Sequence, residues 1–319
     1  MNRSDNSPET VRIDICVCTF RRPELADTLR SLASLDVAAH WWVRVVVADN
    51  DAVPSARGVV DAMRSAVPFP IAYVHCPGAN ISIARNACLE AADGDFLAFL
   101  DDDETAAPEW LAELVATAQT TGADAVLGPV RAHYRADAPR WMREGDFHST
   151  LPVWVRGDII TGYTCNVLLD RSSRSVSGRR FSLARGRTGG EDTEYFAGLH
   201  KSGGKIAFAP KAWVHEPVPA DRARISWLAR RRFRSGQTHG HLIDVKASSV
   251  GMGKQLVLAG AKATYCFLAA GAMVFSAGLR NRYALRGIMH VGVVSGLAGV
   301  RELQQYGDVA SKQGAGIGT

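Results

Sequence analysis

The sequence lacks the features that define several large classes of protein. It contains no low-complexity run, and 47% of its 319 residues are hydrophobic against 22% charged, which excludes a disordered or collagen-like chain. Its six cysteines form no C-x-x-C pair, so a small disulfide-stapled scaffold is excluded and free thiols in a reducing cytoplasm are expected. The first ten residues lack the apolar segment of a signal peptide, and we therefore expect no export. These absences leave a globular chain that is long enough to bury a large core.

Negative charge is scarce in the last third of the chain. Residues 218–319 carry 14 Lys and Arg against 4 Asp and Glu, whereas residues 1–217 carry 23 against 28. The net charge of +5 therefore combines an acidic body with a basic C-terminal part. We expect a metal-using site in the acidic part, and an anionic partner, a phosphate or a membrane surface, for the basic part. The basic residues show no helix-turn-helix or zinc-ligand pattern, so no nucleic-acid partner is expected.

Strand-like and helix-like segments alternate through the first 130 residues. Short runs rich in Val, Ile and Phe predict strands, and leucines spaced three or four residues apart predict helices. The predicted strands are 13–19, 43–48, 71–75, 96–100 and 125–128, and the predicted helices are 22–35, 56–66, 80–92 and 108–120. This order predicts an α/β fold with a doubly wound parallel sheet, which binds ligands at the carboxyl ends of its strands.

The rest of the chain changes character twice. Residues 133–187 are rich in Arg, Gly, Trp and Ser, and we interpret them as loops and short strands that form an acceptor wall. A loop leading into a helix is predicted over 186–199, and a returning pair of strands is predicted at 205–209 and 212–215. From residue 225 the pattern is that of a basic and then an apolar helix.

An acidic run follows the strand at 96–100. Asp101, Asp102, Asp103 and Glu104 come directly after this apolar strand, so a core element holds them together at a sheet edge. Their like charges repel, and a hard divalent cation, Mg²⁺ or Mn²⁺, relieves the repulsion while bridging carboxylate and diphosphate oxygens. An ordinary acidic turn is the alternative, but the strand context favours the metal site.

Three further motifs carry polar groups at the ends of elements. Asp49-Asn50-Asp51 ends the second strand, where it forms either an Asx-turn or a contact to a base or ribose. The segment 80–86 opens a helix with Arg85 and Asn86 in its first turns, as a simple cap or as a phosphate or base contact. The segment 189–193 places Glu191 and Asp192 after two glycines, which suits either a helix start or a general base.

The order of these motifs resembles glycosyltransferase family 2, the inverting enzymes of the GT-A fold. The resemblance covers about residues 11–217 and is carried by Thr19-Phe-Arg-Arg22, Asp49-Asn50-Asp51, Ala84-Arg85-Asn86, Phe99-Leu-Asp-Asp-Asp103 and Gly190-Glu191-Asp192. Within the family the chain is most similar to bacterial exopolysaccharide glucosyltransferases of the succinoglycan type, through 16–23, 80–86 and 188–192.

The resemblance implies a role for each motif. It assigns donor binding to these residues: Thr19, Arg22, Asp49, Asn50, Asp51, Arg85, Asn86, Asp101 and Asp102. Asp103 would be the direct metal ligand, and His215 is either a further metal ligand or a structural histidine. Asp192 would be the catalytic base, with Glu191 as its neighbour or substitute. Many relatives have Asp-Asp-Gly-Ser after the second strand where this chain has Asp49-Asn-Asp-Ala52, which leaves open whether Asp49 or Asp51 meets the base.

The reaction expected from these roles is inverting transfer of a hexose, glucose by the resemblance, from a UDP-sugar to a hydroxyl of a lipid-linked saccharide. Two alternatives remain. A polyprenyl-phosphate sugar synthase needs no base, and the intact Glu191-Asp192 pair argues against it; a catalytically inactive membrane-bound assembly protein would not need the complete acid set. The expected domains are a flexible N-terminus (1–10), a nucleotide-sugar-binding half (11–130), an acceptor-binding and catalytic half (131–220) and a membrane-associating helical segment (221–319).

Apolar runs of membrane-spanning length are absent from the C-terminal part. The runs 263–279 and 287–300 fall short of the roughly 20 residues that a spanning helix needs. A hairpin through the membrane would also leave the three arginines of the predicted connection 280–286 outside, against the positive-inside tendency. We therefore expect peripheral or re-entrant attachment to the cytoplasmic face of the inner membrane; a soluble helical subdomain is the alternative. The residues expected to face the diphosphate of the acceptor are Arg230, Arg231, Arg232 and Arg234.

Overall fold

The computed structural model describes residues 10–243 and 249–303, and its contacts divide the chain into two compact units. The first unit holds the chain up to residue 131 together with 150–187 and 191–216. The second unit holds 132–149, 188–190 and the chain from 217 onward. The stretch predicted as one acceptor-binding half, 131–220, is therefore shared between the two units.

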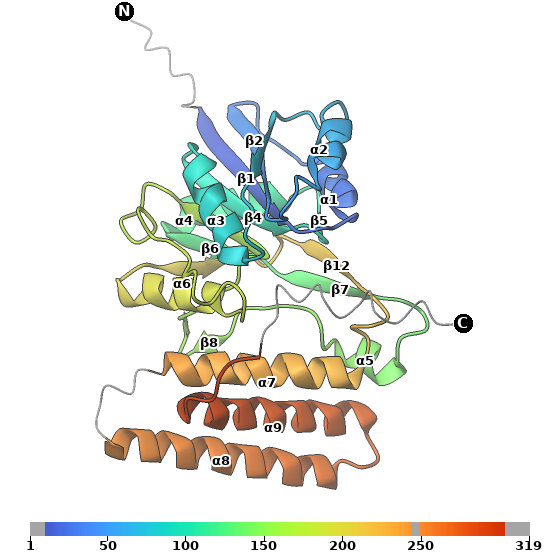
Figure 1. Cartoon of the computed structure of the whole chain (residues 1–319), viewed down its shortest axis with the longest axis vertical. Helices are drawn as coiled ribbons and strands as arrows, with labels where there is room; N and C mark the ends of the chain where they lie inside the picture. Colours follow the sequence, from blue (N-terminus) through green and yellow to red (C-terminus); the bar gives the residue numbers. More distant parts are fainter. Residues whose placement is uncertain (1–9, 244–248, 304–319) are drawn as a thin grey trace, which may run out of the picture. The chain divides into compact units, whose positions relative to one another are not determined.

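A seven-stranded sheet forms the centre of the first unit, in the order β11-β6-β10-β4-β1-β2-β3 (Figure 1). Its strands are β1 (Val11–Thr19), β2 (Trp41–Asp49), β3 (Ile71–His75), β4 (Phe96–Asp101), β6 (Ala125–Leu127), β10 (Asn166–Asp170) and β11 (Ile206–Phe208). The pairs β1–β2, β1–β4, β2–β3 and β6–β11 are parallel. The predicted α/β fold is confirmed, with one strand more than expected: β10 comes from the stretch interpreted as an acceptor wall and runs antiparallel to β4 and β6.

Alternation along the central strands divides the core of this unit into two layers. On β1, Ile13, Ile15 and Val17 belong to one buried cluster, whereas Cys16 belongs to the other, as the two-residue period of a strand requires. The first cluster includes residues of α1 (Leu25–Leu32), α2 (Arg57–Met63) and α4 (Trp110–Thr121); the second includes residues of α3 (Ile81–Ala91) and α6 (Glu191–Lys201). Helices thus cover both faces of the sheet.

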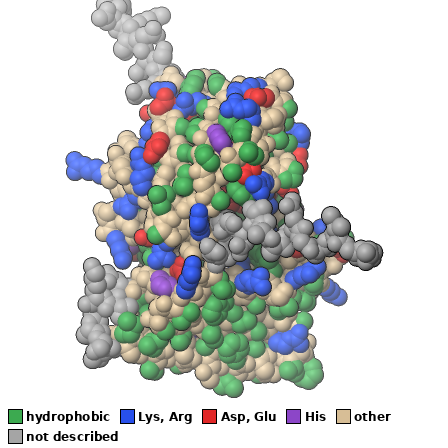
Figure 2. Space-filling view, in the orientation of Figure 1, with side chains coloured by type: hydrophobic (Ala, Val, Ile, Leu, Met, Phe, Trp, Pro, Cys, Tyr) green, Lys and Arg blue, Asp and Glu red, His purple; other side chains and the backbone are tan. Residues whose placement is uncertain are grey.

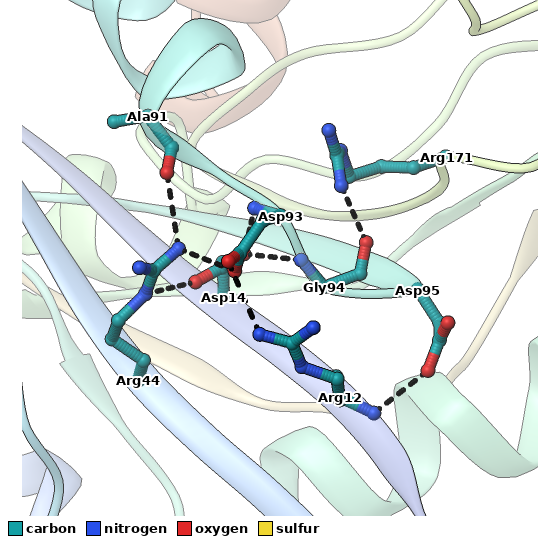
Figure 3. A network of polar contacts seen from close by, with 8 residues as sticks. All are labelled: Arg12, Asp14, Arg44, Ala91, Asp93, Gly94, Asp95 and Arg171. Carbon is teal, nitrogen blue, oxygen red and sulfur yellow. Dashed lines mark hydrogen bonds and ion pairs between the residues drawn. The ribbon is translucent and has the colours of Figure 1, made fainter.

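A buried polar network fixes the loop that leads into β4 (Figure 3). The carboxylate of Asp14 on β1 accepts hydrogen bonds from the backbone N–H of Asp93 and Gly94, at 2.8 and 2.7 Å, and from the guanidinium of Arg44 on β2 at 2.7 Å. Asp14 has no solvent exposure, so these donors replace the water that its charge would otherwise require. The network ties β1, β2 and the start of β4 together.

The short strands complete the structure and correct one prediction. They are β5 (Thr105–Ala106), β7 (Val130–Tyr134), β8 (Trp154–Val155), β9 (Asp158–Ile159) and β12 (Val214–Val218). The predicted pairing of 205–209 with 212–215 is wrong: β11 joins β6 in the main sheet, and β12 pairs antiparallel with β5. A turn closed by the Ala212 N–H and the Ala209 carbonyl at 3.2 Å separates the two strands.

The second unit is mainly helical, with α5 (Arg140–Gly145), α7 (Ile225–Leu242), α8 (Ser249–Ala272) and α9 (Ala277–Leu297). In it α9 lies between α7 and α8 (Figure 1). The predicted connection at 280–286 is wrong, because α9 begins earlier: the Ser276 hydroxyl caps it by accepting from the Leu279 N–H at 3.4 Å. Arg280, Arg282 and Arg286 therefore lie on a helix instead of in a loop.

Candidate active site

Three neighbouring strands of the main sheet end at one edge. The register places Thr19 at the end of β1 beside Asp49 of β2, and Cys18 beside Asp101 of β4. The prediction that both acidic motifs lie at the carboxyl ends of parallel strands is therefore confirmed. From β1 the sheet continues to β2 and β3 on one side and to β4 on the other. The edge at which the carboxyl ends of these strands meet is the usual ligand-binding edge of such sheets.

The acidic run after β4 concentrates negative charge away from water. Asp102 and Glu104 are buried, and Asp101 and Asp103 are partly buried. The pKa of Asp101 is raised to about 6 and that of Asp102 to about 7, mainly by burial. The charge of the Asp103 carboxylate also contributes to both shifts. Burial and the charge of Asp101 also raise the pKa of Glu104 well above its usual range. The site therefore has an excess of negative charge, which a cation would relieve.

Arg22 lies against this acidic turn. Its Nε is 3.9 Å from Asp102 Oδ1, and its Nη2 is 3.7 Å from Asp103 Oδ2. Its side chain is 40% exposed, so it neutralises the acids only partly while keeping donors toward solvent. Arg22 is thereby placed to meet a phosphate that approaches the acidic turn.

The donor set at this edge fits a hard divalent cation. Ligand atoms of Asp101, Glu104 and Cys165 lie within 4.8 Å of one another. Burial raises the pKa of the Cys165 thiol well above its usual range, and the carboxylates of Asp101 and Glu104 are the harder ligands of the group. Oxygen ligands suit Mg²⁺ or Mn²⁺.

Sequence reasoning did not select two members of this group. Glu104 was noted as part of the acidic run without a site role, and Cys165 was not considered. Cys165 precedes Asn166, which pairs with Leu100 across the antiparallel strands β10 and β4. Only the position of β10 in the sheet brings Cys165 to the end of β4, and the sequence, which predicts loops and short strands over 133–187, does not give that position.

The side chain of Asp49, predicted to bind the donor, is occupied by protein donors. It is fully buried and accepts hydrogen bonds from the N–H of Asp51 at 3.0 Å, the N–H of Ala56 at 2.8 Å and the Tyr73 hydroxyl at 2.7 Å. These bonds fold the loop that follows β2 and satisfy the start of α2. The structure thus gives Asp49 a loop-shaping role.

The next two residues of that loop are also held from within the protein. Asn50 donates to the Cys76 carbonyl and accepts from the Asn80 N–H, both at 2.5 Å. Asp51 forms a two-point ion pair with Arg21, with both N–O distances at 2.8 Å. A small pocket lined by Arg21, Arg22, Pro23, Ser55, Ala56 and Val59 adjoins this loop.

Arg85 and Glu191 form a buried ion pair that joins two motifs distant in sequence. Both side chains are more than nine-tenths buried, and the bond connects α3 to the first residue of α6. Arg85 is predicted to meet the nucleotide, and that role stays a prediction; its bond to Glu191 also anchors the helix that carries Asp192. The second oxygen of Glu191, Oε2, is buried without a hydrogen-bond partner among the described residues.

Asn86, also predicted to bind the donor, fixes a loop. Its side-chain oxygen accepts from the Phe181 N–H at 2.8 Å, and its amide donates to the Phe181 carbonyl at 2.9 Å. The ring of Phe181 packs under Arg85, with the guanidinium carbon 5.6 Å from the ring centroid. Asn86 thus supports the surroundings of the ion pair.

Asp192 follows Glu191 at the start of α6. Its Oδ1 accepts from the Thr193 N–H at 2.6 Å, which orients the carboxylate. Gly189 and Gly190 before it both have φ of +86°, a conformation that other residues adopt only with strain. The charge of Asp192 contributes to the raised pKa of Asp101. This contribution is smaller than those of burial and of the Asp103 charge, and it places the start of α6 within electrostatic range of the acidic turn.

The remaining predicted residues lie on two other elements. His215 is on β12, where it pairs with Thr105, two residues after Asp103. This places the imidazole-bearing residue on a strand next to the acidic turn, and its ligand role stays a prediction. The arginines predicted to bind the acceptor diphosphate lie on α7 in the second unit.

Comparison with known proteins identifies the family. The family model described as glycosyl transferase family 2 matches residues 14–176. The chain belongs to glycosyltransferase family 2. It is 62% identical over 299 residues to the succinoglycan biosynthesis protein ExoM of Rhizobium meliloti, which covers 94% of this chain and 97% of ExoM. It is 24% identical over 247 residues to a glucosyl-dolichyl phosphate glucuronosyltransferase of Haloferax volcanii, covering 71% of this chain and 75% of that protein.

Solved structures show the same fold for this family 2 glycosyltransferase. The mannosyltransferase PcManGT of Pyrobaculum calidifontis, in complex with GDP-Man and Mn²⁺, superposes with a TM-score of 0.62 at 17% identity, covering 92% of this chain and 90% of that one. S. aureus TarS 1–349 in complex with UDP-GlcNAc gives 0.52 at 16% identity, covering 93% and 97%. The GT-A fold and the resemblance to succinoglycan-type transferases expected from the sequence are both confirmed.

Proposed function

We propose that this glycosyltransferase transfers a hexose from a UDP-sugar to a hydroxyl of a lipid-linked saccharide during assembly of a succinoglycan-type exopolysaccharide. The hexose that we propose is glucose. The identity to ExoM, which extends over almost the whole of both chains, supports the pathway. The observation that carries the reaction is the electrostatic proximity of the Asp101–Asp103 turn to Asp192 at the start of α6. The Asp101–Asp103 turn suits a diphosphate with its metal, and Asp192 suits an acceptor hydroxyl.

On the donor side, the carboxylates after β4 would hold Mg²⁺ or Mn²⁺. Asp101 and Asp103 offer oxygens from one turn, and His215 offers a nitrogen from the adjacent strand β12. When bound, the ion supplies charge neutralisation to the departing diphosphate. Arg22, which approaches both Asp102 and Asp103, would add a second positive charge on the phosphate side.

On the acceptor side, Asp192 would act as the general base. Glu191 is committed to Arg85, which leaves Asp192 as the carboxylate of this pair that can meet an acceptor. In the transfer, the Asp192 carboxylate takes the proton of the acceptor hydroxyl while that oxygen forms its bond to C1 of the sugar. The bond from C1 to the UDP oxygen breaks on the opposite face, and the configuration at C1 inverts.

The second unit would serve the lipid-linked partner at the cytoplasmic face of the inner membrane. Helix α7 carries four arginines close together in sequence, which are Arg230, Arg231, Arg232 and Arg234. Burial and the charge of Arg231 lower the pKa of Arg232, which marks a concentration of positive charge that an anion would relieve. We therefore propose that this arginine group binds the diphosphate of the acceptor.

A donor screen against a pool of lipid-linked saccharides tests the function. Purified protein is incubated with Mn²⁺ and single nucleotide sugars, and products are identified by mass spectrometry and by the anomeric proton signal. The expected product is a saccharide heavier by one hexose, with inverted anomeric configuration, formed from UDP-glucose. Transfer to polyprenyl phosphate itself, or no transfer with any donor, would contradict the proposal.

A further inference from the structure

Helix α8 has its large hydrophobic side chains on the outside. The residues that it buries are small ones at helical spacing, Ala259, Ala263, Cys266 and Ala270. A helix that belongs to a soluble core buries its larger residues and leaves smaller or polar ones in water. The distribution on α8 is the reverse of that pattern.

The exposed surface of α8 forms a continuous apolar strip. Val257 and Leu268 are both 71% exposed, and they share one side of the helix because their positions differ by eleven residues, about three turns. We define the outer face of α8 as the exposed large residues Val257, Leu258 and Leu268. Phe267 and Tyr265 border α9 instead, since a Cβ on Gly287 would lie 2.9 Å from the Phe267 ring and the Tyr265 ring lies 6.5 Å from that of Tyr283. Burial of apolar side chains of this size is favourable, so the outer face has a strong tendency to leave water.

The apolar strip continues into the turn after the helix. Met273 and Val274 are exposed, and Phe275 is fully exposed at the tip. Figure 2 shows hydrophobic side chains gathered over this helix layer, with Lys and Arg beside them. A patch of this extent on a soluble monomer marks a contact with a partner or a membrane.

Helix α9 does not need the outer face of α8 for its own burial. It packs against α7 through glycines: a Cβ on Gly236 would lie 2.0 Å from the Met289 carbonyl, and one on Gly292 would lie 2.0 Å from the Phe233 carbonyl. The two backbones therefore approach closely on one side of α9, and the small inner residues of α8 approach its other side. The outer face of α8 therefore lies on the side of that helix away from α9.

The charge around the outer face has one sign. Lys254 and Lys262 lie on α8, and Arg280, Arg282 and Arg286 lie on α9. Between residues 225 and 300 the only acidic residue in the sequence is Asp244. Among the described helices none combines the length and the apolar character that crossing a membrane requires.

We propose that the outer face of α8 and the tip at Phe275 form a docking surface for an anionic lipid bilayer, with the helix lying along the membrane. Apolar side chains enter the acyl boundary while the basic residues meet the headgroups. A second copy of the chain fits less well, because a symmetric contact would bring the same lysines and arginines together. The proposal rests on the proposed function in one respect, which is that the acceptor is lipid-linked.

Flotation of the full-length protein with vesicles tests the docking surface. Vesicles of phosphatidylcholine alone are compared with vesicles that also contain phosphatidylglycerol. The test variant is Val257→Asp/Leu268→Asp, and its matched control is Leu151→Asp/Val153→Asp, which adds the same charge at residues that are 59% and 64% exposed in the first unit. UDP binding by calorimetry in all three proteins shows that the fold is intact.

The wild type is expected to float with phosphatidylglycerol vesicles, and the α8 variant to lose at least about tenfold in partition, since two buried apolar contacts are removed. The control is expected to bind like the wild type. Three results would overturn the proposal: no binding by the wild type, an equal loss in variant and control, or a wild-type dimer that the α8 substitutions dissociate without changing vesicle binding.

A soluble acceptor separates this proposal from the proposed function. Transfer of hexose to a short saccharide without a lipid needs the active site and not the docking surface. If that transfer proceeds while the wild-type protein does not bind vesicles, the docking proposal is contradicted and the proposed function is not. If vesicles bind but no acceptor is glycosylated, the docking surface stands and the proposed function fails.

Discussion

Two adjacent carboxylates at the start of α6 have different surroundings. Glu191 is 3% exposed and ion-paired with Arg85, and burial raises its pKa. Asp192 is partly exposed and acts electrostatically on Asp101. Their surroundings therefore differ, although the sequence presents them as equivalent acids, and this difference is why we propose a positioning role for Glu191 and the role of base for Asp192.

Removing a ligand from the acidic turn should weaken the donor and the metal together. Asp103→Ala is expected to lower both Mn²⁺ and UDP affinity, because the ion links the carboxylates to the diphosphate. Isothermal titration with UDP, with and without Mn²⁺, measures both effects. Asp61→Ala, at an exposed aspartate of α2, is the control and should bind like the wild type; unchanged Mn²⁺-dependent UDP binding in Asp103→Ala would exclude Asp103 as a ligand.

The raised pKa values of the acidic turn predict a pH-dependent metal site. Protons compete with Mn²⁺ for Asp101, and protonation of the neighbouring Asp102 removes a negative charge beside the ion, so Mn²⁺ affinity should fall as the pH drops through about 7 and then about 6. In the metal-free protein, stability should change with pH in the direction opposite to that of Mn²⁺ affinity. The folded state holds protons that the unfolded state releases, so stability should fall as the pH rises toward 7.

Melting temperatures measured across this pH range with and without Mn²⁺ test both signs. The stabilisation by Mn²⁺ is expected to grow with pH. A constant increment at every pH would show that Asp101 does not bind the ion and that the charge of Asp102 does not act on it.

At the scale of elements, one buried ion pair fixes the catalytic helix. Arg85 on α3 and Glu191 on α6 form an ion pair between these two helices, and removal of one partner leaves the other charge buried and uncompensated. Such a loss typically costs 3–5 kcal/mol. The pair therefore couples the stability of the fold to the position of Asp192.

A mutant cycle on this pair should separate stability from activity. Arg85→Met is expected to lower the free energy of unfolding by about 3 kcal/mol, and Arg85→Met/Glu191→Gln to recover part of the loss because no buried charge remains. Transfer should stay slow in both, since α6 has lost its anchor. Urea unfolding and turnover are measured for each variant.

The control for this cycle is an exposed pair of the same type. Arg140→Met breaks the ion pair with Glu144, whose side chains are 83% and 61% exposed, and it should change stability by less than about 1 kcal/mol. If the double variant of the buried pair regained full turnover, Arg85 and Glu191 would have no positioning role.

The sequence predicted the elements whose signals are local. Alternation of apolar residues located β1, β2, β3 and β4, and Asn80 was placed correctly at the start of α3, where its side chain accepts from the Ser82 N–H. The antiparallel strand β10 was not predicted, because its place between β4 and β6 depends on contacts distant along the chain. The same reason explains why the sequence does not indicate Cys165 or the loop contacts of Asp49, Asn50 and Asn86. The donor-binding roles of these three residues stay predictions.

At the scale of the whole molecule, charge separates the two units. The acidic body of the sequence supplies the catalytic unit, and the basic C-terminal part supplies the helical unit with its exposed apolar helix. An enzyme with a soluble anionic donor and a lipid-linked anionic acceptor needs surfaces of both kinds. The charge division visible in the sequence therefore agrees with the proposed pair of substrates.

Donor selectivity is expected to favour uridine. The loop 49–52 is fixed by Asp49 and Asn50, and a rigid loop at the end of β2 would fit a pyrimidine more readily than the larger guanine. Displacement of labelled UDP by unlabelled UDP and GDP measures the preference, with GDP expected to require at least about tenfold more. Equal displacement would contradict a uridine-selective site.

The most direct test of the catalytic proposal is the turnover of Asp192→Asn at saturating donor and Mn²⁺. Asparagine keeps the size of the side chain but cannot take a proton, so binding should be preserved while turnover falls by a factor on the order of 10² to 10⁴. Turnover close to that of the wild type would contradict the assignment of Asp192 as the base.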